Sequence, residues 1–288
     1  MIEVLSPGPY ATVQDLGRHG YAHLGVPCSG AADEASLRLA NRLVGNPQEA
    51  AGIELTYGRA RLAFHAGAWV AVTGARCPLT VRSPLPVGAG TGVPFWVPAG
   101  AEVRFGAPVW GLRTYLAVRG GIAVEPVLGS RSTDSLSGLG PAPLRQGSML
   151  PVGDSGSLVE ISVDLAPAGE PPPAVLRIVP GPRDDWFAPG ALAELCAQPY
   201  EVSQDSNRVG VRLLGREPTR ARKDELPSEG MVTGAVQVPP SGQPIVFLAD
   251  HPPTGGYPVI GVVRAADLPI AAQLRPGGRV RFTVRPGR

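Results

Sequence analysis

Short apolar runs separated by glycine and proline dominate the first half of the chain. The clearest of them are Arg61–Phe64, Trp69–Val72, Pro94–Val97, Glu102–Phe105 and Thr114–Val118. Runs of this length between turn-forming residues are typical of β-strands, and their regular spacing indicates a barrel or sandwich. Further strands are predicted at Ile2–Leu5, Leu176–Val179 and Ile245–Ala249. The pattern therefore predicts a mainly β fold.

Helical periodicity is confined to a few segments. Over Ser29–Asn46, apolar residues recur at the spacing of a helix face, with Ser29 or Asp33 as the N-cap and Gly45 as the stop signal. A second, shorter helix is predicted over Pro189–Ala197. Glu54 lies between two apolar residues, and we interpret it as the outward residue of an alternating strand.

The two halves of the chain resemble each other. Val13–Gly20 aligns with Ser203–Gly210, so that Gln, Asp, Arg and Gly recur at one constant offset. A second match pairs Leu144–Gly147 with Leu274–Gly277 in the same order. We predict a duplicated β-barrel unit, with domains at 1–165 and 174–288 joined by a proline-rich linker over 166–173.

Composition excludes several classes of protein. The net charge is +2 from 26 basic and 24 acidic residues, which predicts no nucleic-acid or anionic-membrane partner. No apolar run reaches membrane-spanning length, and no signal peptide is recognisable, so a cytoplasmic location is predicted. Cys28, Cys77 and Cys196 are far apart, and His19 and His23 have no evident third ligand, so we predict reduced thiols and no metal site.

The segment Asp250–Gly261 reads D-H-P-P-T-G-G-Y-P-V-I-G. It follows a buried apolar strand, and the chain is expected to leave the core at Asp250. Gly255 and Gly256 can adopt positive φ and allow close approach of the backbone. Two interpretations are open: a stiff surface turn with a capping aspartate, or a rigid loop that presents N–H groups and a carboxylate to a small ligand.

Two other polar segments leave similar alternatives. Thr12–Gly20 is either a turn closed by an Asp15–Arg18 ion pair or a ligand-binding arm. Under the duplication, Asp205–Arg208 would do equivalent work. The segment Val127–Asp134, which leads into a Ser/Gly-rich loop to Gly140, is either a flexible surface loop or an oxyanion site built on Arg131 and backbone N–H groups.

Five motifs in order carry a family resemblance: Thr12–Arg18, Gly25–Pro27 with Ser29–Gly30, Ala40–Asn46, Leu128–Thr133 and Thr254–Pro258. They resemble the KipA family, which is also known as allophanate hydrolase subunit 2, as the C subunit of 5-oxoprolinase and as the biotin-dependent carboxyltransferase-like family. The resemblance covers essentially the whole chain. Departures are Ala32, where the family commonly has Met, and His251–Pro253, which precede Thr254 where the family usually has Gln-Thr-Thr.

This resemblance implies two cyclophilin-like β-barrel domains and a KipI-like subunit as partner, often with a third subunit of the LamB/YcsF type. Together such subunits resemble an ATP-dependent 5-oxoprolinase, which converts 5-oxoproline, ATP and water into L-glutamate, ADP and phosphate. A related domain in urea carboxylase moves a carboxyl group from carboxybiotin to urea, and another member binds a histidine-kinase inhibitor. An amide-directed carboxyltransferase and a non-enzymatic regulator are therefore the alternatives.

The chain lacks a P-loop and the Ser-x-x-Lys and Gly-x-Ser-x-Gly motifs. We therefore expect a subunit that is inactive alone, with ATP bound together with a partner subunit; biotin, needed only for the carboxyltransferase, would come in trans because no Ala-Met-Lys-Met sequence is present. Asp250 is predicted as acid/base and Arg131 as oxyanion holder. The residues predicted to bind the small amide or lactam substrate are Thr254, Gly255, Gly256, Tyr257, Gln237, Gln14 and Arg18.

Overall fold

The fold is that of a computed structural model, which describes residues 1–84, 86–167, 169–222 and 224–284. The chain divides into two compact units. Unit 1 comprises Met1–Arg18, Ser29–Asp134 and Gly138–Pro171, and unit 2 comprises His19–Cys28, Ser135–Ser137 and Pro172–Arg288. Two short segments from the N-terminal half thus belong to unit 2, whereas the sequence placed both in the first domain. The predicted linker over 166–173 includes residue 168, which lies outside the described residues.

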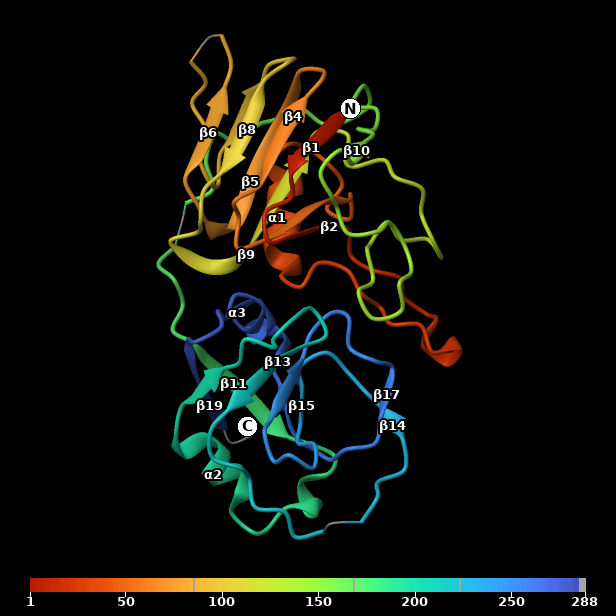
Figure 1. The fold of residues 1–288 in the computed structure, drawn as a ribbon, viewed down its shortest axis with the longest axis vertical. Helices are drawn as coiled ribbons and strands as arrows, with labels where there is room; N and C mark the ends of the chain where they lie inside the picture. Colours follow the sequence, from red (N-terminus) through yellow and green to blue (C-terminus); the bar gives the residue numbers. More distant parts are fainter. Residues whose placement is uncertain (85, 168, 223, 285–288) are drawn as a thin grey trace. The chain divides into compact units, whose positions relative to one another are not determined.

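Unit 1 contains two antiparallel five-stranded sheets around a shared apolar core (Figure 1). The first sheet has the order β10 (Met149–Leu150), β1 (Ile2–Ser6), β4 (Arg61–Phe64), β8 (Glu102–Phe105) and β6 (Leu79–Arg82). The second has the order β2 (Tyr10–Gln14), β3 (Gly52–Thr56), β9 (Trp110–Val118), β5 (Ala68–Arg76) and β7 (Pro94–Val97). The strands predicted at β4, β7 and β8 have the expected bounds.

Helix α1 (Glu34–Leu43) packs against β5 and β9 through its apolar face. Of the two predicted N-caps, Ser29 and Asp33, the structure has Asp33: its Oδ1 accepts a hydrogen bond from the Ser36 amide at 3.1 Å. Gly45, at φ +69°, follows the helix, and a Cβ there would lie 2.6 Å from the Val159 carbonyl oxygen. The stop signal at Gly45 is therefore required both by its left-handed backbone and by close packing.

Glu54 on β3 corrects the interpretation of an outward-facing acid. Its side chain is buried, and its Oε2 accepts hydrogen bonds from the Tyr115 hydroxyl at 2.8 Å and the Ala32 amide at 3.0 Å. Arg113 lies 3.5 Å from the other carboxylate oxygen. Burial, followed by the nearby Glu54 charge, raises the pKa of Tyr115 well above its usual value, so the hydroxyl stays a donor. This network fixes the start of α1 to the sheet.

Unit 2 is a closed barrel. Its neighbouring strands are antiparallel except for β11 and β19, which run parallel. Its strand order is β11 (Val175–Pro180), β18 (Val259–Val263), β15 (Ala235–Gln237), β16 (Ile245–Phe247), β13 (Gly210–Leu214), β12 (Tyr200–Val202) and β19 (Arg279–Val284). Helices α2 (Ala191–Ala197) and α3 (Leu268–Ala272) and the small ribbon β14 (Glu229–Gly230) with β17 (Thr254–Gly255) complete it. The mainly β class with a few short helices is confirmed.

Three short 3-10 helices, at Ala22–Leu24, Asp184–Trp186 and Ala265–Asp267, complete the described secondary structure. Within the described ranges, every helix is too short or too polar to cross a bilayer. All three cysteines are unbridged thiols.

Candidate functional site

Asp250 begins the loop that leads to the Gly-Gly-Tyr motif, but it does not leave the core. Its side chain is fully buried, and the Arg208 guanidinium donates to both carboxylate oxygens, at 3.0 and 2.8 Å. The amide and the hydroxyl of Ser135 donate to Oδ2 at 3.0 and 2.6 Å. The expected exit at Asp250 is wrong because the carboxylate serves as a buried anchor, and a buried charge requires such partners.

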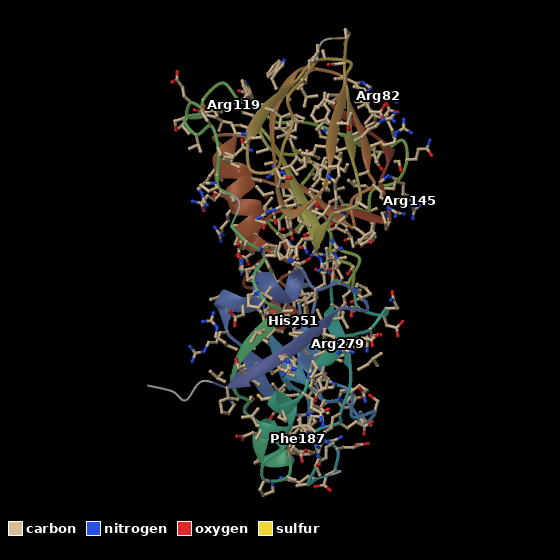
Figure 2. All side chains as sticks on the ribbon, turned by 90° about the vertical axis from the view of Figure 1, so that its left-hand side faces the viewer. Arg82, Arg119, Arg145, Phe187, His251 and Arg279 are labelled. Carbon is tan, nitrogen blue, oxygen red and sulfur yellow. The ribbon has the colours of Figure 1, made fainter. Side chains whose placement is uncertain are left out.

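His251 is also buried and stacks on Phe247, with ring centroids 5.8 Å apart and planes at 23°. Its Nδ1 lies 2.8 Å from the Pro252 carbonyl oxygen. Burial lowers the pKa of His251, so the ring is held neutral near pH 7. Figure 2 labels this residue. The base of the loop is thus fixed on both sides by packed side chains.

The Gly-Gly-Tyr motif is held by a two-stranded ribbon and by Gln237. Gly255 pairs with Glu229 across the ribbon, and the Gln237 Nε2 donates to the Tyr257 carbonyl at 3.2 Å. Neither Gly255 nor Gly256 has positive φ, contrary to expectation. Close approach explains the first glycine instead, because a Cβ on Gly255 would lie 2.8 Å from Gln237 Nε2. The partner strand is itself anchored where Arg183 pairs with Glu229, which lowers the pKa of that carboxyl group.

A pocket of about 340 Å³ and another of about 620 Å³ lie in the described part of the chain, and the larger is in unit 2. The residues that line the larger pocket are Arg220, Asp224, Glu225, Leu226, Pro240, Gly256 and Tyr257. The Nε of Arg220 is buried and has no hydrogen-bond partner among the described residues. A buried donor without a partner is costly, so this N–H marks Arg220 as an incompletely satisfied charged residue in the wall of the pocket.

Arg220 is a site residue that sequence reasoning missed. It stands in the run Thr219-Arg220-Ala221-Arg222, in a chain whose basic residues are almost all arginine. No spacing or motif separates it from the others. Only the fold brings it into the lining of the same pocket as Tyr257, which is 45% exposed.

In unit 1, Asp15 organises the segment that precedes Asp134. Its carboxylate accepts hydrogen bonds from the Ser130 and Ser132 hydroxyls at 2.6 and 2.5 Å, the Arg131 amide at 2.5 Å and the Gly17 amide at 2.8 Å. The predicted Asp15–Arg18 pair is therefore wrong, because donors far along the chain saturate the carboxylate. The prediction of a flexible surface loop is likewise wrong for residues 130–134, of which all but Arg131 are buried.

Arg18 and Gln14 bond to the same segment. Arg18 is 2% exposed, donates to the Ser132 carbonyl at 2.5 Å and lies 3.9 Å from the Asp134 carboxylate. Gln14 donates to the Thr133 carbonyl at 2.9 Å, and its Oε1 is buried without a partner among the described residues. The half-buried Arg131 uses its Nε on the Val124 carbonyl at 2.7 Å. The predicted residues Gln14, Arg18 and Arg131 therefore all lie in or contact the segment 131–134.

The two copies of the Gln-Asp-x-x-Arg segment place only their arginine in an equivalent environment. Arg208, like Arg18, is 2% exposed and pairs with an aspartate distant in sequence. Asp205 is exposed, whereas Asp15 is buried. The expectation of equivalent Asp–Arg pairs is therefore wrong, and the internal duplication stays a prediction.

Apart from Asp250, the predicted site residues fall into two groups. Gly256 and Tyr257 line the larger pocket. Gln237 holds the loop that carries them, because its Nε2 packs closely on Gly255 and donates a hydrogen bond to the Tyr257 carbonyl. Thr254 is exposed on the ribbon beside them. Gln14, Arg18 and Arg131 form the second group in unit 1. No cluster of three or more potential metal ligands occurs in the ranges that the structure describes.

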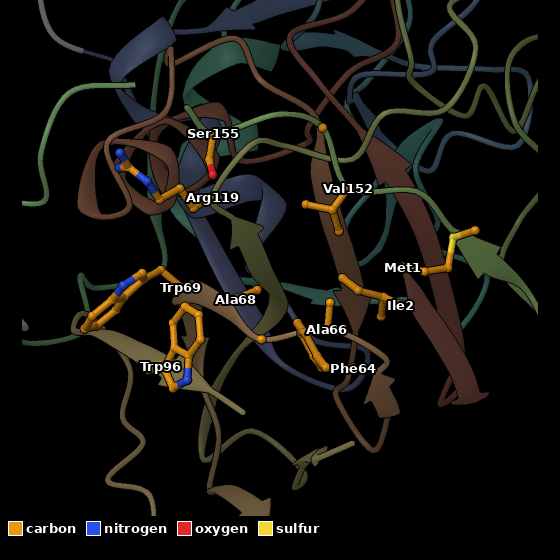
Figure 3. A pocket seen from close by; sticks show the side chains of 12 residues that line it. Met1, Ile2, Phe64, Ala66, Ala68, Trp69, Trp96, Arg119, Val152 and Ser155 are labelled. Carbon is orange, nitrogen blue, oxygen red and sulfur yellow. The ribbon is translucent and has the colours of Figure 1, made fainter. Parts of the chain in front are cut away.

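The smaller pocket, of about 340 Å³, opens on unit 1 and contains none of the predicted site residues (Figure 3). Trp69 and Trp96 stand at one end of it, edge to face with centroids 5.9 Å apart, and both are partly exposed. Arg119 lines it as well, but its guanidinium donates to backbone carbonyls, among them that of Val44 at 2.9 Å.

Comparison with known proteins gives a consistent picture. The family model for the carboxyltransferase domain, subdomain A and B, matches residues 24–284. The chain is 38% identical over 287 residues to the C subunit of 5-oxoprolinase from Escherichia coli (strain K12), covering 98% of this chain and 90% of that protein. It is 36% identical over 314 residues to urea amidolyase of Lachancea kluyveri, covering 97% of this chain but 17% of that protein.

Solved structures agree. The crystal structure of TTHA0988 is similar with a TM-score of 0.86 and 38% identity, covering 98% of this chain and 55% of that one. The K. lactis urea amidolyase has a TM-score of 0.88 and 31% identity, covering 98% of this chain and 18% of that one. This chain therefore spans about half of the first protein and a small part of the second.

Proposed function

Because the chain belongs to the carboxyltransferase domain, subdomain A and B, family, we propose that it is a subunit of an ATP-dependent 5-oxoprolinase. The reaction converts 5-oxoproline, ATP and water into L-glutamate, ADP and phosphate. The observation that carries the proposal is the similarity to two relatives named as the C subunit of 5-oxoprolinase, which are 38% and 33% identical to this chain and are each covered to 90% of their length. Its partners would be a KipI-like subunit and a LamB/YcsF-type subunit.

The larger pocket of unit 2 is the proposed substrate site. 5-Oxoproline has one carboxylate and one ring amide, and the two need different partners. The Arg220 guanidinium carries a positive charge in the wall of this pocket and suits the carboxylate. The Gly256 backbone and the Tyr257 side chain line the same pocket and suit the lactam ring. Thr254, Gly255 and Gln237 would hold this loop in shape.

Asp250 is proposed to position that loop. A general base must reach the proton that it removes, and a carboxylate that already accepts from Arg208 and Ser135 in a fully buried place is poorly suited to that task. Its bonds instead fix the start of the segment that ends at Tyr257. Arg131 is still proposed to bind an oxyanion. Gln14 and Arg18 would hold the segment 131–134 in place through their hydrogen bonds to its carbonyl groups.

ATP is proposed to bind together with a partner subunit. Phosphorylation of the lactam carbonyl oxygen needs cations and N–H donors around the phosphoryl group, and this chain has no P-loop to provide them. We therefore expect the isolated chain to be inactive, with turnover only in the assembled complex.

A carboxyltransferase acting on urea-like amides is the alternative, supported by the similarity to urea amidolyase. It would require biotin on a partner, because this chain has no biotinylation sequence. A regulator that binds a KipI-like inhibitor is the third function of the family, and it would need neither ATP nor a filled pocket.

The test is release of ADP and glutamate from 5-oxoproline by the co-purified complex, with and without this chain. Turnover that requires the chain supports the proposal, and a stable complex without turnover favours an alternative. Arg220→Ala should raise the KM for 5-oxoproline about 10- to 100-fold, because a charge-assisted hydrogen bond contributes ~1.5–3 kcal/mol. Arg212→Ala, which removes an exposed arginine outside the pocket, should leave the KM unchanged.

A further inference from the structure

The segment His19–Cys28 forms a closed surface loop within unit 2. The 3-10 helix Ala22–Leu24 forms its tip, Leu24 is 64% exposed, and the amides of Leu24 and Val26 donate to the Tyr21 carbonyl at 2.9 and 3.3 Å. Gly25 ends the helix in the left-handed conformation at φ +75°. The loop therefore has a defined path that returns its last residue to its first.

The path of the loop places the Cys28 side chain next to the His19 ring. The Cys28 Sγ lies 3.2 Å from the His19 Nδ1 and 3.8 Å from its Nε2; His19 is exposed and Cys28 is half-buried. At this distance the His19 Nδ1, in the tautomer that leaves it unprotonated, is placed to accept a hydrogen bond from the Cys28 thiol. The thiolate is the nucleophilic form of cysteine, and a neighbouring histidine is one of the groups that increase its population.

The other two cysteines have different neighbours, and Cys196 has the same intermediate exposure as Cys28. Cys77 is 7% exposed, and burial raises the pKa of its thiol. Burial also raises the pKa of Cys196, which is only partly exposed. Cys77 contacts the Thr114 hydroxyl and Cys196 the backbone of Val284, so both provide internal controls for the reactivity of Cys28.

We propose that Cys28 is a site of reversible modification by small disulfides, with His19 as its base. In the first step His19 takes the proton of the Cys28 thiol. The thiolate sulfur then attacks one sulfur of a low-molecular-weight disulfide, so that a new S–S bond forms to Cys28 and the original S–S bond breaks. The departing thiolate carries the electron pair away and takes up the proton from His19.

The sequence allows each cysteine to be followed separately. Trypsin cleavage at arginine places Cys28 in the peptide 19–38, Cys77 in 77–82 and Cys196 in 184–208. The full chain is incubated with oxidised glutathione at pH 7, and the modified fraction of each peptide is measured by mass spectrometry against time. We expect Cys28 to react at least about tenfold faster than Cys196, since a free thiol of pKa ~8.5 is only a few per cent thiolate at pH 7. Equal rates for the two peptides overturn the proposal.

His19→Asn tests the base, and His23→Asn on the same loop is the matched control. His19→Asn should slow modification of Cys28 about tenfold at pH 7, with rates approaching the unaltered chain near pH ~9.5, where the thiol ionises without help. His23→Asn should react at the original rate, and Tyr21 is the remaining titratable side chain of the loop. An unchanged rate for His19→Asn at pH 7 overturns the assignment. The comparison of Cys28 with Cys196 in the unaltered chain needs no variant and stands whether or not the variants fold.

Discussion

Asp250→Asn tests whether the loop that carries Tyr257 depends on a buried ion pair. The substitution keeps the size of the side chain and one oxygen acceptor, but removes the negative charge that faces Arg208. Both side chains are almost inaccessible to water, at 0% and 2% exposure, so solvent cannot replace the lost charge. The Arg208 guanidinium would then be buried without the carboxylate that it bonds at 2.8 and 3.0 Å.

The expected cost is ~3–5 kcal/mol, which is typical when one partner of a buried pair is removed. This is a large share of the ~5–15 kcal/mol by which domains are usually stable. A double variant with Arg208→Gln should cost less than the sum of the two single changes, by about 1–3 kcal/mol, because the two residues interact directly. The exposed pair Arg38–Glu34 provides the contrast: Arg38→Gln should cost about 0.5 kcal/mol or less.

Urea unfolding followed by circular dichroism measures these free energies. A cost below about 1 kcal/mol for Asp250→Asn, together with additive effects in the double variant, would refute the anchoring role derived from burial. If such a stable variant also assembled with its partners but lost all turnover, Asp250 would be an acid or base in the reaction, as the sequence predicted. The two roles are therefore separated by one variant and two measurements.

Three further outcomes are expected. Gly255→Ala places a methyl group 2.8 Å from Gln237 Nε2, so it should displace that amide and raise the KM of the complex for substrate, whereas an unchanged KM would remove the loop from recognition. Tyr115→Phe leaves Glu54 without its 2.8 Å donor and should cost about 1–3 kcal/mol in urea unfolding; a neutral effect would contradict the network. The folded-state pKa of His251 is lowered from 6.5, so the unfolded chain binds this proton more readily, and stability should fall as the pH drops from about 7.5 to about 5.5. His251→Asn should lose less stability over that interval, and equal losses would be inconsistent with a buried neutral ring.

Local signals in the sequence predicted the parts of the fold that depend on neighbours in the chain. Asp33 caps α1 through a residue three positions away, and Gly45 ends the helix where expected. The strands β4, β7 and β8 follow from apolar runs between turn formers. In these places the determining contacts lie within a few residues, so the pattern contains them.

Buried charges were not predictable, because their partners are distant in sequence. Glu54 was taken for a surface residue, yet its donor Tyr115 is 61 positions away. The donors to Asp15 in the 130–132 segment lie 115 to 117 positions away, which no turn motif reveals. Arg220 had no signal at all, since only the fold brings it into the lining of the same pocket as Tyr257. Family motifs identified the Gly-Gly-Tyr loop, but not the side chains that complete its pocket.

The membership of Ser135–Ser137 in unit 2 has a consequence for any attempt to dissect the protein. A cut in the linker separates Ser135 from Asp250, to which it donates at 3.0 and 2.6 Å, although both belong to one compact unit. A fragment that starts after the linker would fold without two donors to a buried carboxylate. The division that the linear sequence suggests is therefore not the boundary of cooperative structure, and split versions of this protein would have to be produced together so that one fragment supplies the other with its missing serine.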